Sequence, residues 1–190
     1  MLGSLQFSRI IPLVFKKVDV CSVSEDGNPG SANVFKYCGI FTGIICLFLD
    51  ILKGFIPPFV AILFLPVNSV FFSLDMVAPV LGHAVGLFNR FNGGKCIATS
   101  IGVVLASLFI TYIGAILAVT YVACAIIFKK DHRTASVVAF SIFALSATIL
   151  GFIVRAPFVG IGFLFISVTA ISKHLPKRTN ERVEDKSDTV

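Results

Sequence analysis

The chain has 190 residues, of which 56% are hydrophobic and only 14% are charged, and its mean hydropathy is +0.95. A chain so rich in apolar residues is not a soluble globular domain of this length, so we expect it to lie largely in lipid. A net charge of +6 would suit nucleic acid in a soluble protein, but here the cations fall between apolar segments, as in membrane proteins. We therefore expect no nucleic-acid partner.

Seven apolar segments, separated by polar breaks, predict an all-α polytopic membrane protein with about seven transmembrane helices. Most of them approach the roughly 20 residues that a helix needs to cross a bilayer, and they are continuously apolar rather than alternating as barrel strands do. The predicted spans are residues 2–15, 40–56, 67–88, 97–112, 113–128, 135–154 and 158–171.

The first predicted span is short for a complete crossing and contains Arg9 and Pro12. We therefore expect a helix shorter than a full membrane crossing. The segment lacks the basic start of a signal peptide, so we do not interpret it as one. The apolar stretch 97–128 could form one long tilted helix, but two helices with a turn at 112–114 fit better.

The distribution of Lys and Arg between the loops supports seven spans. With seven spans, Arg155 alone falls on the face opposite to the other loop cations, whereas merging the fourth and fifth spans would divide those cations between both faces. The cations that share a face are Lys16, Lys17, Lys36, Arg90, Lys95, Lys129, Lys130, Arg133 and the five after Ile171. This bias predicts a protein of the cell (inner or plasma) membrane with its C-terminus in the cytoplasm and its N-terminus outside. We divide the chain into a membrane domain at 1–173 and a polar cytoplasmic tail at 174–190.

The five cysteines form no CxxC pair and have no accompanying histidine cluster. We interpret them as small buried residues, and we expect neither a metal site nor a cofactor.

The loop after the first span, DVCSVSEDGNPGSANVFK, is dense in Gly, Asn, Ser and Pro. Such a loop can turn several backbone N–H groups toward an anion and cradle a phosphate, although an ordinary polar connector has the same composition. The candidates in it are Gly27, Asn28, Gly30 and Asn33.

The second span carries Asp50 and Lys53 on one helical face, followed by Pro57 and Pro58, which we expect to disrupt the helix. Charges at membrane depth need partners. The two residues are either a self-neutralising structural pair, or they place Lys53 at the cytoplasmic end of an aqueous pocket.

The end of the third span places His83 just inside the membrane, ahead of Gly93, Gly94 and Lys95 at the start of the next helix. Free backbone N–H groups, the positive end of a helix dipole and a flexible cation together suit a phosphate group. The spacing is not that of a nucleotide-binding P-loop. A lone membrane histidine can be a hydrogen-bonded structural residue, but it can also bind phosphate or move protons.

Four motifs in order carry a resemblance to a known family: GSLQF, EDGNPGSANVF, GIICLFLDILKGFIP and LGHAVGLFNRFNGGKCIATSIG. Over about residues 2–173 the chain resembles the bacterial acyl-phosphate:glycerol-3-phosphate acyltransferases. The segment RTAS, from Arg133 to Ser136, is similar to a weaker motif of that family.

The resemblance implies an integral membrane enzyme with a cytoplasmic active site. It would transfer an acyl group from acyl phosphate to the first hydroxyl of glycerol 3-phosphate, giving lysophosphatidic acid for phospholipid synthesis. The implied partners are these two substrates and membrane lipid, and the oligomeric state stays open. By position in the motifs, the implied catalytic residues are Ser4, His83 and Lys95, and the implied substrate-binding residues are Gly27, Asn28, Gly30, Asn33, Lys53, Gly93, Gly94 and His174.

The chain departs from the family pattern at several positions. Cys21 stands near the place of an arginine, and Glu25 and Asp26 stand where the family has small residues. Negative charge beside a phosphate site should weaken anion binding unless Lys16, Lys17 or Arg9 compensates. Further departures are Gly86, Asn92, Cys96 and the segment KHLPKRTN.

These departures leave two other function classes to consider. The first is a non-catalytic relative that binds a phosphate-bearing lipid or regulates another membrane enzyme. The second is a small transporter, because Asp50, Lys53 and His83 are ionisable groups within predicted spans.

Overall fold

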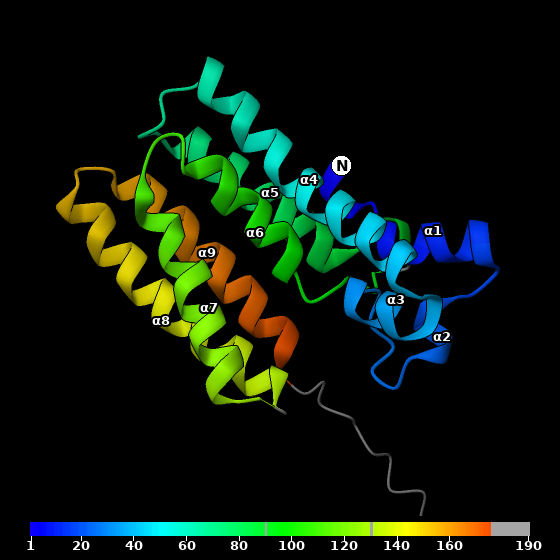
Figure 1. The fold of residues 1–190 in the computed structure, drawn as a ribbon. Coiled ribbons are helices and arrows are strands. Elements are labelled where there is room, and N and C mark those ends of the chain that lie inside the picture. Colours follow the sequence, from blue (N-terminus) through cyan, green and yellow to red (C-terminus); the bar gives the residue numbers. More distant parts are fainter. Residues whose placement is uncertain (90, 130, 176–190) are drawn as a thin grey trace, which may run out of the picture.

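The computed structural model describes residues 1–89, 91–129 and 131–175, and every regular element in these ranges is a helix (Figure 1). The predicted all-α fold class is therefore confirmed. With η marking a 3-10 helix, the elements in chain order are η1 (Leu2–Ser4), α1 (Phe7–Lys16), α2 (Val20–Val23), α3 (Ser31–Cys38), α4 (Ile40–Phe64), α5 (Val70–Val85), η2 (Leu87–Asn89), α6 (Ile97–Ser107), η3 (Tyr112–Gly114), α7 (Ala115–Ile127), α8 (His132–Ile153) and α9 (Pro157–His174).

Four helical segments of the described chain are long and apolar enough to cross a membrane: α4, α5 with η2, α8 and α9. The helix α6 has 11 residues and α7 has 13, which is fewer than a full crossing needs. The helix α1 has ten residues and is about 15 Å long at 1.5 Å per residue. The count of seven crossings is therefore not confirmed, although each predicted span contains a helix.

Two boundary predictions have clear outcomes. The two-helix interpretation of 97–128 is confirmed, because η3 lies at the predicted turn and the Thr111 hydroxyl accepts a hydrogen bond from the Ile113 N–H. The predicted disruption at Pro57 and Pro58 is wrong, because α4 continues through both prolines to Phe64. Arg90, Lys130 and the tail beyond residue 175, which enter the charge and domain predictions, lie outside the described residues.

Helices α5, α6, α8 and α9 enclose the main core, in which Phe72, Met76, Phe143 and Phe163 are fully buried. Large apolar side chains also cover the outside of the bundle; Phe41 on α4, for example, is 79% exposed. An apolar exterior of this kind is what a protein surrounded by lipid requires.

Helices α4 and α6 approach each other closely at small residues. A Cβ added to Gly102 would lie 2.0 Å from the Ile51 carbonyl oxygen and 2.8 Å from the Phe55 nitrogen. These backbone atoms cannot move aside as a side chain would, so the contact requires glycine.

We expect Gly102→Ala to destabilise the protein by an amount at the upper end of the ~1–3 kcal/mol that overpacking costs. Thermal unfolding in detergent measures the effect. Leu105→Ala, on the same helix but at a 42% exposed position, is the matched control and should unfold near the wild-type temperature. Equal melting temperatures for Gly102→Ala and the wild type would contradict the close contact.

Candidate active site

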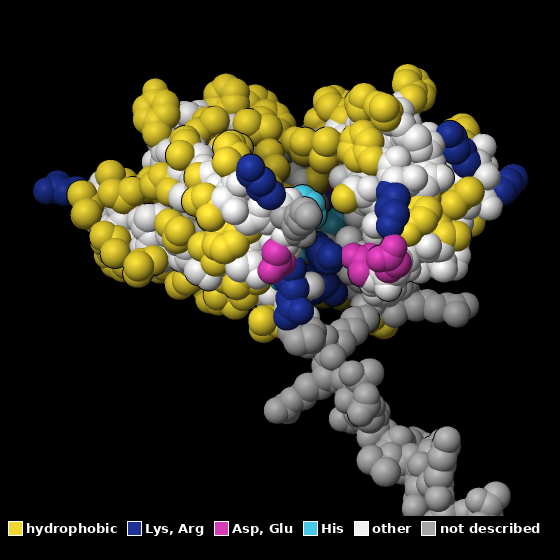
Figure 2. All heavy atoms as spheres, turned by 60° about the horizontal axis from the view of Figure 1, so that its bottom comes forward, with side chains coloured by type: hydrophobic (Ala, Val, Ile, Leu, Met, Phe, Trp, Pro, Cys, Tyr) yellow, Lys and Arg dark blue, Asp and Glu magenta, His cyan; other side chains and the backbone are white. Residues whose placement is uncertain are grey.

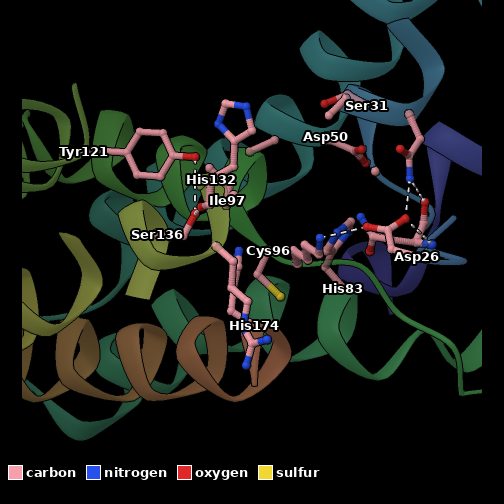
Figure 3. Close-up of a pocket in the computed structure, with 17 residues that line it drawn as sticks. Asp26, Ser31, Asp50, His83, Cys96, Ile97, Tyr121, His132, Ser136 and His174 are labelled. Carbon is pink, nitrogen blue, oxygen red and sulfur yellow. Dashed lines mark hydrogen bonds and ion pairs between the residues drawn. The ribbon is translucent and has the colours of Figure 1, made fainter. Parts of the chain in front are cut away.

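A cavity of about 380 Å³ lies at one end of the bundle, where the end of α5, the start of α6, the start of α8 and the end of α9 meet. Figure 2 shows it as a hollow in which His, Lys, Arg and acidic side chains gather, with hydrophobic side chains on both flanks. Figure 3 shows its labelled side chains pointing inward from several helices. The polar and charged residues that line it are Asp26, Asn28, Ser31, Asn33, Asp50, His83, Lys95, Tyr121, His132, Arg133, Ser136 and His174.

The buried ion pair of α4 lies beside the cavity, which both Asp50 and His83 line. The Lys53 ammonium forms an ion pair of 2.7 Å with Asp50 Oδ1, lies 2.7 Å from His83 Nδ1, and donates a hydrogen bond to the Leu5 carbonyl. The other Asp50 oxygen accepts a hydrogen bond of 2.6 Å from the Ser8 hydroxyl. Because an ammonium can donate but cannot accept, His83 Nδ1 is the acceptor of the Lys53 contact, and a neutral ring carries its proton on Nε2.

The His83 ring is held in place by the chain around it. The backbone carbonyl of His83 accepts hydrogen bonds from the Gln6 amide at 2.9 Å and from the Gly94 N–H at 3.1 Å. A Cβ on Gly94 would lie 2.2 Å from His83 Nε2, and one on Gly93 would lie 2.0 Å from the Ala84 carbonyl oxygen. The paired glycines therefore allow the α5–α6 connection to pass directly against the histidine.

The glycine-rich loop surrounds a carboxylate. Asp26 Oδ2 lies 2.8 Å from the Lys95 ammonium, and Asp26 Oδ1 accepts hydrogen bonds from the Asn33 amide at 2.8 Å and from the Asn28 N–H at 3.2 Å. Burial alone would raise the pKa of Asp26, but the hydrogen bonds from Lys95 and Asn33 outweigh it and hold that pKa below its ordinary value. Asp26 is therefore an anion at neutral pH.

The compensation for the acidic loop residues differs from our expectation. Arg9 pairs with Asp19, and the Lys16 ammonium donates to the Cys38 carbonyl, so neither neutralises Glu25 or Asp26. Lys95 does so at Asp26, and Lys36 does so at Glu25, at 2.8 Å. Both lysines follow Glu25 and Asp26 in sequence, and the fold brings each of them to its acidic partner.

The opposite wall of the cavity comes from α7, α8 and α9. The Ser136 hydroxyl donates to the His132 carbonyl at 2.8 Å and lies 3.5 Å from the Tyr121 hydroxyl, and Arg133 lies beside them. His174 Nδ1 lies 2.8 Å from the Ala170 carbonyl, which can only accept, so this nitrogen is the donor. A neutral His174 therefore keeps the lone pair of Nε2 free.

The structure brings most of the predicted site residues together. Six of them line the cavity, and they are Asn28, Gly30, Asn33, His83, Lys95 and His174. Lys53, Gly93 and Gly94 contact His83 or its neighbours from behind, as described above, and Gly27 adopts a left-handed φ of 58° in the adjacent loop.

Ser4 differs from the other predicted site residues. It is buried in η1, which packs on α5 where Gly3 meets Pro79 and Gly82, and it is not among the residues that line the cavity. Gln6 and Ser8 were not predicted as site residues, although polar residues within an apolar predicted span were a signal for them. Tyr121 and His132 carried no comparable signal.

The helical architecture, the apolar exterior and a cavity rich in anion-binding groups define an integral membrane protein with a site for anionic ligands. Comparison with known proteins identifies the family to which this membrane protein belongs. The sequence model of the family described as glycerol-3-phosphate acyltransferase matches residues 1–180. The chain belongs to this family, and the family, the enzyme class and the membrane-embedded location predicted from the four motifs are confirmed.

Individual relatives match over most of their length. Glycerol-3-phosphate acyltransferase 2 of Thermotoga maritima is 35% identical over 173 residues, which cover 91% of this chain and 84% of the relative. A glycerol-3-phosphate acyltransferase of Staphylococcus haemolyticus is 34% identical over 189 residues, which cover 95% of this chain and 87% of the relative.

Two crystal structures of PlsY (YgiH), an integral membrane glycerol 3-phosphate acyltransferase, are also similar. The glycerol 3-phosphate form has a TM-score of 0.77 at 32% identity, and the lysophosphatidic acid form has a TM-score of 0.75 at 30% identity. Each comparison covers 91% of this chain and 82% of the other.

Proposed function

We propose that this chain transfers an acyl group from acyl phosphate to the first hydroxyl of glycerol 3-phosphate, releasing lysophosphatidic acid and inorganic phosphate. Family membership supports the acceptor and the product, since the similar PlsY structures are described as glycerol 3-phosphate and lysophosphatidic acid forms. The observation that carries the proposal is a cavity with anion-binding groups on two walls.

The two walls match the two phosphates of the reaction. One wall of the cavity, which we call the loop wall, consists of the glycine-rich loop and Lys95, and it offers donors from Lys95 and Asn33. The opposite wall offers donors from Arg133 and His132. Acyl phosphate and glycerol 3-phosphate each carry a phosphate, and the reaction requires both to be held with the acceptor hydroxyl near the acyl carbonyl carbon. The apolar exterior of the bundle suits the acyl chain, which must extend into lipid.

The reaction itself needs little more than positioning and charge stabilisation. The hydroxyl oxygen forms a new ester bond with the carbonyl carbon, the anhydride bond between that carbon and the phosphate oxygen breaks, and phosphate leaves with the bonding electrons. We assign the Nε2–H of His83 as a donor to the oxygen that gains charge, and the free Nε2 of His174 as an acceptor for the hydroxyl proton. Lys53 is a positioning residue, because it fixes the tautomer of His83.

For the orientation, we propose that the cavity faces the cytoplasm of a cell membrane. The cations beside the cavity support this, because Lys95 and Arg133 belong to the basic side predicted by the charge bias. As part of this proposal we keep the division into a membrane domain and a polar tail, but we move the boundary from 173 to 174, because His174 ends α9 and lines the cavity.

The test is acyl transfer from palmitoyl phosphate to radiolabelled glycerol 3-phosphate by the purified protein in detergent. We expect turnover by the wild type and a loss of about 100-fold in kcat/KM for His83→Ala and for Lys95→Ala, which is typical of removing a preorganised donor. Lys36→Ala removes a lysine that pairs with Glu25 and is not among the cavity residues, so it should retain activity. No turnover by folded wild-type protein would favour the non-catalytic binding alternative.

A further inference from the structure

We propose that Asp26 is an internal competitor for substrate phosphate at Lys95, so that a phosphate binds at the loop wall only when the contact between these two side chains breaks. This inference rests on the proposed function and adds a residue that sets the affinity for phosphorylated ligands. The shared chemistry of those ligands is a phosphate monoester, which both substrates contain.

The first observation is that the Asp26 carboxylate occupies the donors of the loop wall. A side-chain ammonium from Lys95, an amide from Asn33 and the backbone N–H of Asn28 all end on its two oxygens. Ammonium, amide and backbone N–H groups are the donors by which proteins hold phosphate. The carboxylate is therefore bound as a phosphate would be bound.

The second observation is the exposure of this contact. The side chains of Lys95 and Asp26 are 38% and 41% exposed, whereas those of Lys53 and Asp50 are 1% and 2% exposed. An exposed ion pair contributes little and exchanges readily, while a buried one cannot be opened without stranding a charge. Asp26 can therefore release its lysine to an incoming ligand, and Asp50 cannot.

Charge repulsion also opposes the binding of phosphate next to Asp26. A phosphate beside Lys95 would place at least one further negative charge next to the ionised Asp26, which disfavours occupancy by both. Because the product of acyl transfer to glycerol 3-phosphate keeps the phosphate, the same competition weakens the binding of substrate and product. Asp26 thus sets how tightly the loop wall holds either of them.

The test is Asp26→Asn. The asparagine oxygen can still accept from Asn33 and from the Asn28 N–H, while its amide nitrogen cannot accept from Lys95, so the variant frees the lysine and keeps the loop. Glu25→Gln is the matched control, because it removes the same charge from the neighbouring residue, whose partner is Lys36. We expect the KM of at least one phosphorylated substrate to fall about fivefold in Asp26→Asn, the factor for loss of an exposed ion pair, and to stay unchanged in Glu25→Gln.

Measuring KM separately for glycerol 3-phosphate and for palmitoyl phosphate shows whose phosphate Lys95 holds. The same comparison in a Lys95→Ala background tests the mechanism, because only the charge repulsion by Asp26 remains once the lysine is gone, and the gain from Asp26→Asn should then be much smaller. An unchanged or higher KM for both substrates overturns the inference, and so does a gain that Glu25→Gln shares or that is equally large without Lys95.

Equilibrium binding separates this inference from the proposed function. Glycerol 3-phosphate and hexadecyl phosphate cannot react with each other, so isothermal titration calorimetry with each of them reports binding without turnover. Tighter binding by Asp26→Asn in a protein that turns over nothing supports the competitor and refutes the acyltransferase. Turnover by the wild type, with equal binding by wild type and Asp26→Asn, refutes the competitor alone.

Discussion

Lys53→Met should reduce acyl transfer about 1000-fold and also destabilise the fold, because Lys53 both positions His83 and neutralises the buried Asp50. Without its ammonium, Asp50 keeps the Ser8 hydroxyl but loses its counter-ion in a site that is almost fully buried. Stranding one partner of a buried pair typically costs about 3–5 kcal/mol. His83 also loses the donor to Nδ1, so its ring is free to change tautomer and orientation, and the loss of activity should combine the penalties of charge stabilisation and positioning.

The two effects can be separated with a double variant. Asp50→Asn/Lys53→Met removes both charges, so much of the lost stability should return, while the missing donor to His83 keeps activity low. Thermal unfolding in detergent and kcat/KM with palmitoyl phosphate measure the two quantities. Near wild-type activity in the folded single variant would show that Lys53 does not govern the state of His83.

Gly94→Ala should lower kcat/KM by at least about 100-fold, the typical cost of displacing a catalytic group by about 1 Å. The backbone of Gly94 has no positive φ, so alanine fits there without backbone strain. Its added methyl would overlap His83 Nε2, and the imidazole would have to leave the position that Lys53 and the cavity define. The effect should therefore appear in activity more than in the melting temperature.

Gly39→Ala is the contrasting control. Gly39 has a φ of +85° and open space around the position of a Cβ, so alanine there strains the backbone and touches nothing. Because Gly39 has a ψ of 168°, in a region that is almost restricted to glycine, that variant should lose about 1–3 kcal/mol of stability and keep its activity. If Gly94→Ala were as active as Gly39→Ala, the close contact with His83 would be irrelevant to catalysis.

Local patterns predicted much of this molecule. Apolar run lengths located the helices, and the charge bias between loops correctly divided 97–128 into two of them. The motifs correctly predicted that His83 and Lys95 line the cavity. A glycine pair and a lysine at the start of a helix are a local pattern that suits an anion, so this part of the site could be predicted from the sequence.

Contacts between distant segments were not predictable in the same way. His83 follows Lys53 by 30 positions and Lys95 follows Asp26 by 69, and no periodicity links either pair. Whether Asp50 and Lys53 faced lipid, a cavity or each other depended on depth in the bundle, which composition does not encode. The predicted disruption of α4 at its prolines was wrong for a related reason. Neighbouring helices in a membrane can stabilise a proline-containing helix that would be interrupted in isolation.

The position of the cavity at one end of the bundle has a consequence for the membrane itself. Helix ends lie near one surface of a bilayer, so the proposed reaction would draw its acyl donor from the leaflet on that side and leave its lipid product there. A phosphorylated headgroup does not cross the hydrocarbon layer unaided. Newly made lipid would therefore accumulate on one side of the membrane, and the growth of the opposite leaflet would depend on a separate protein that moves lipids across.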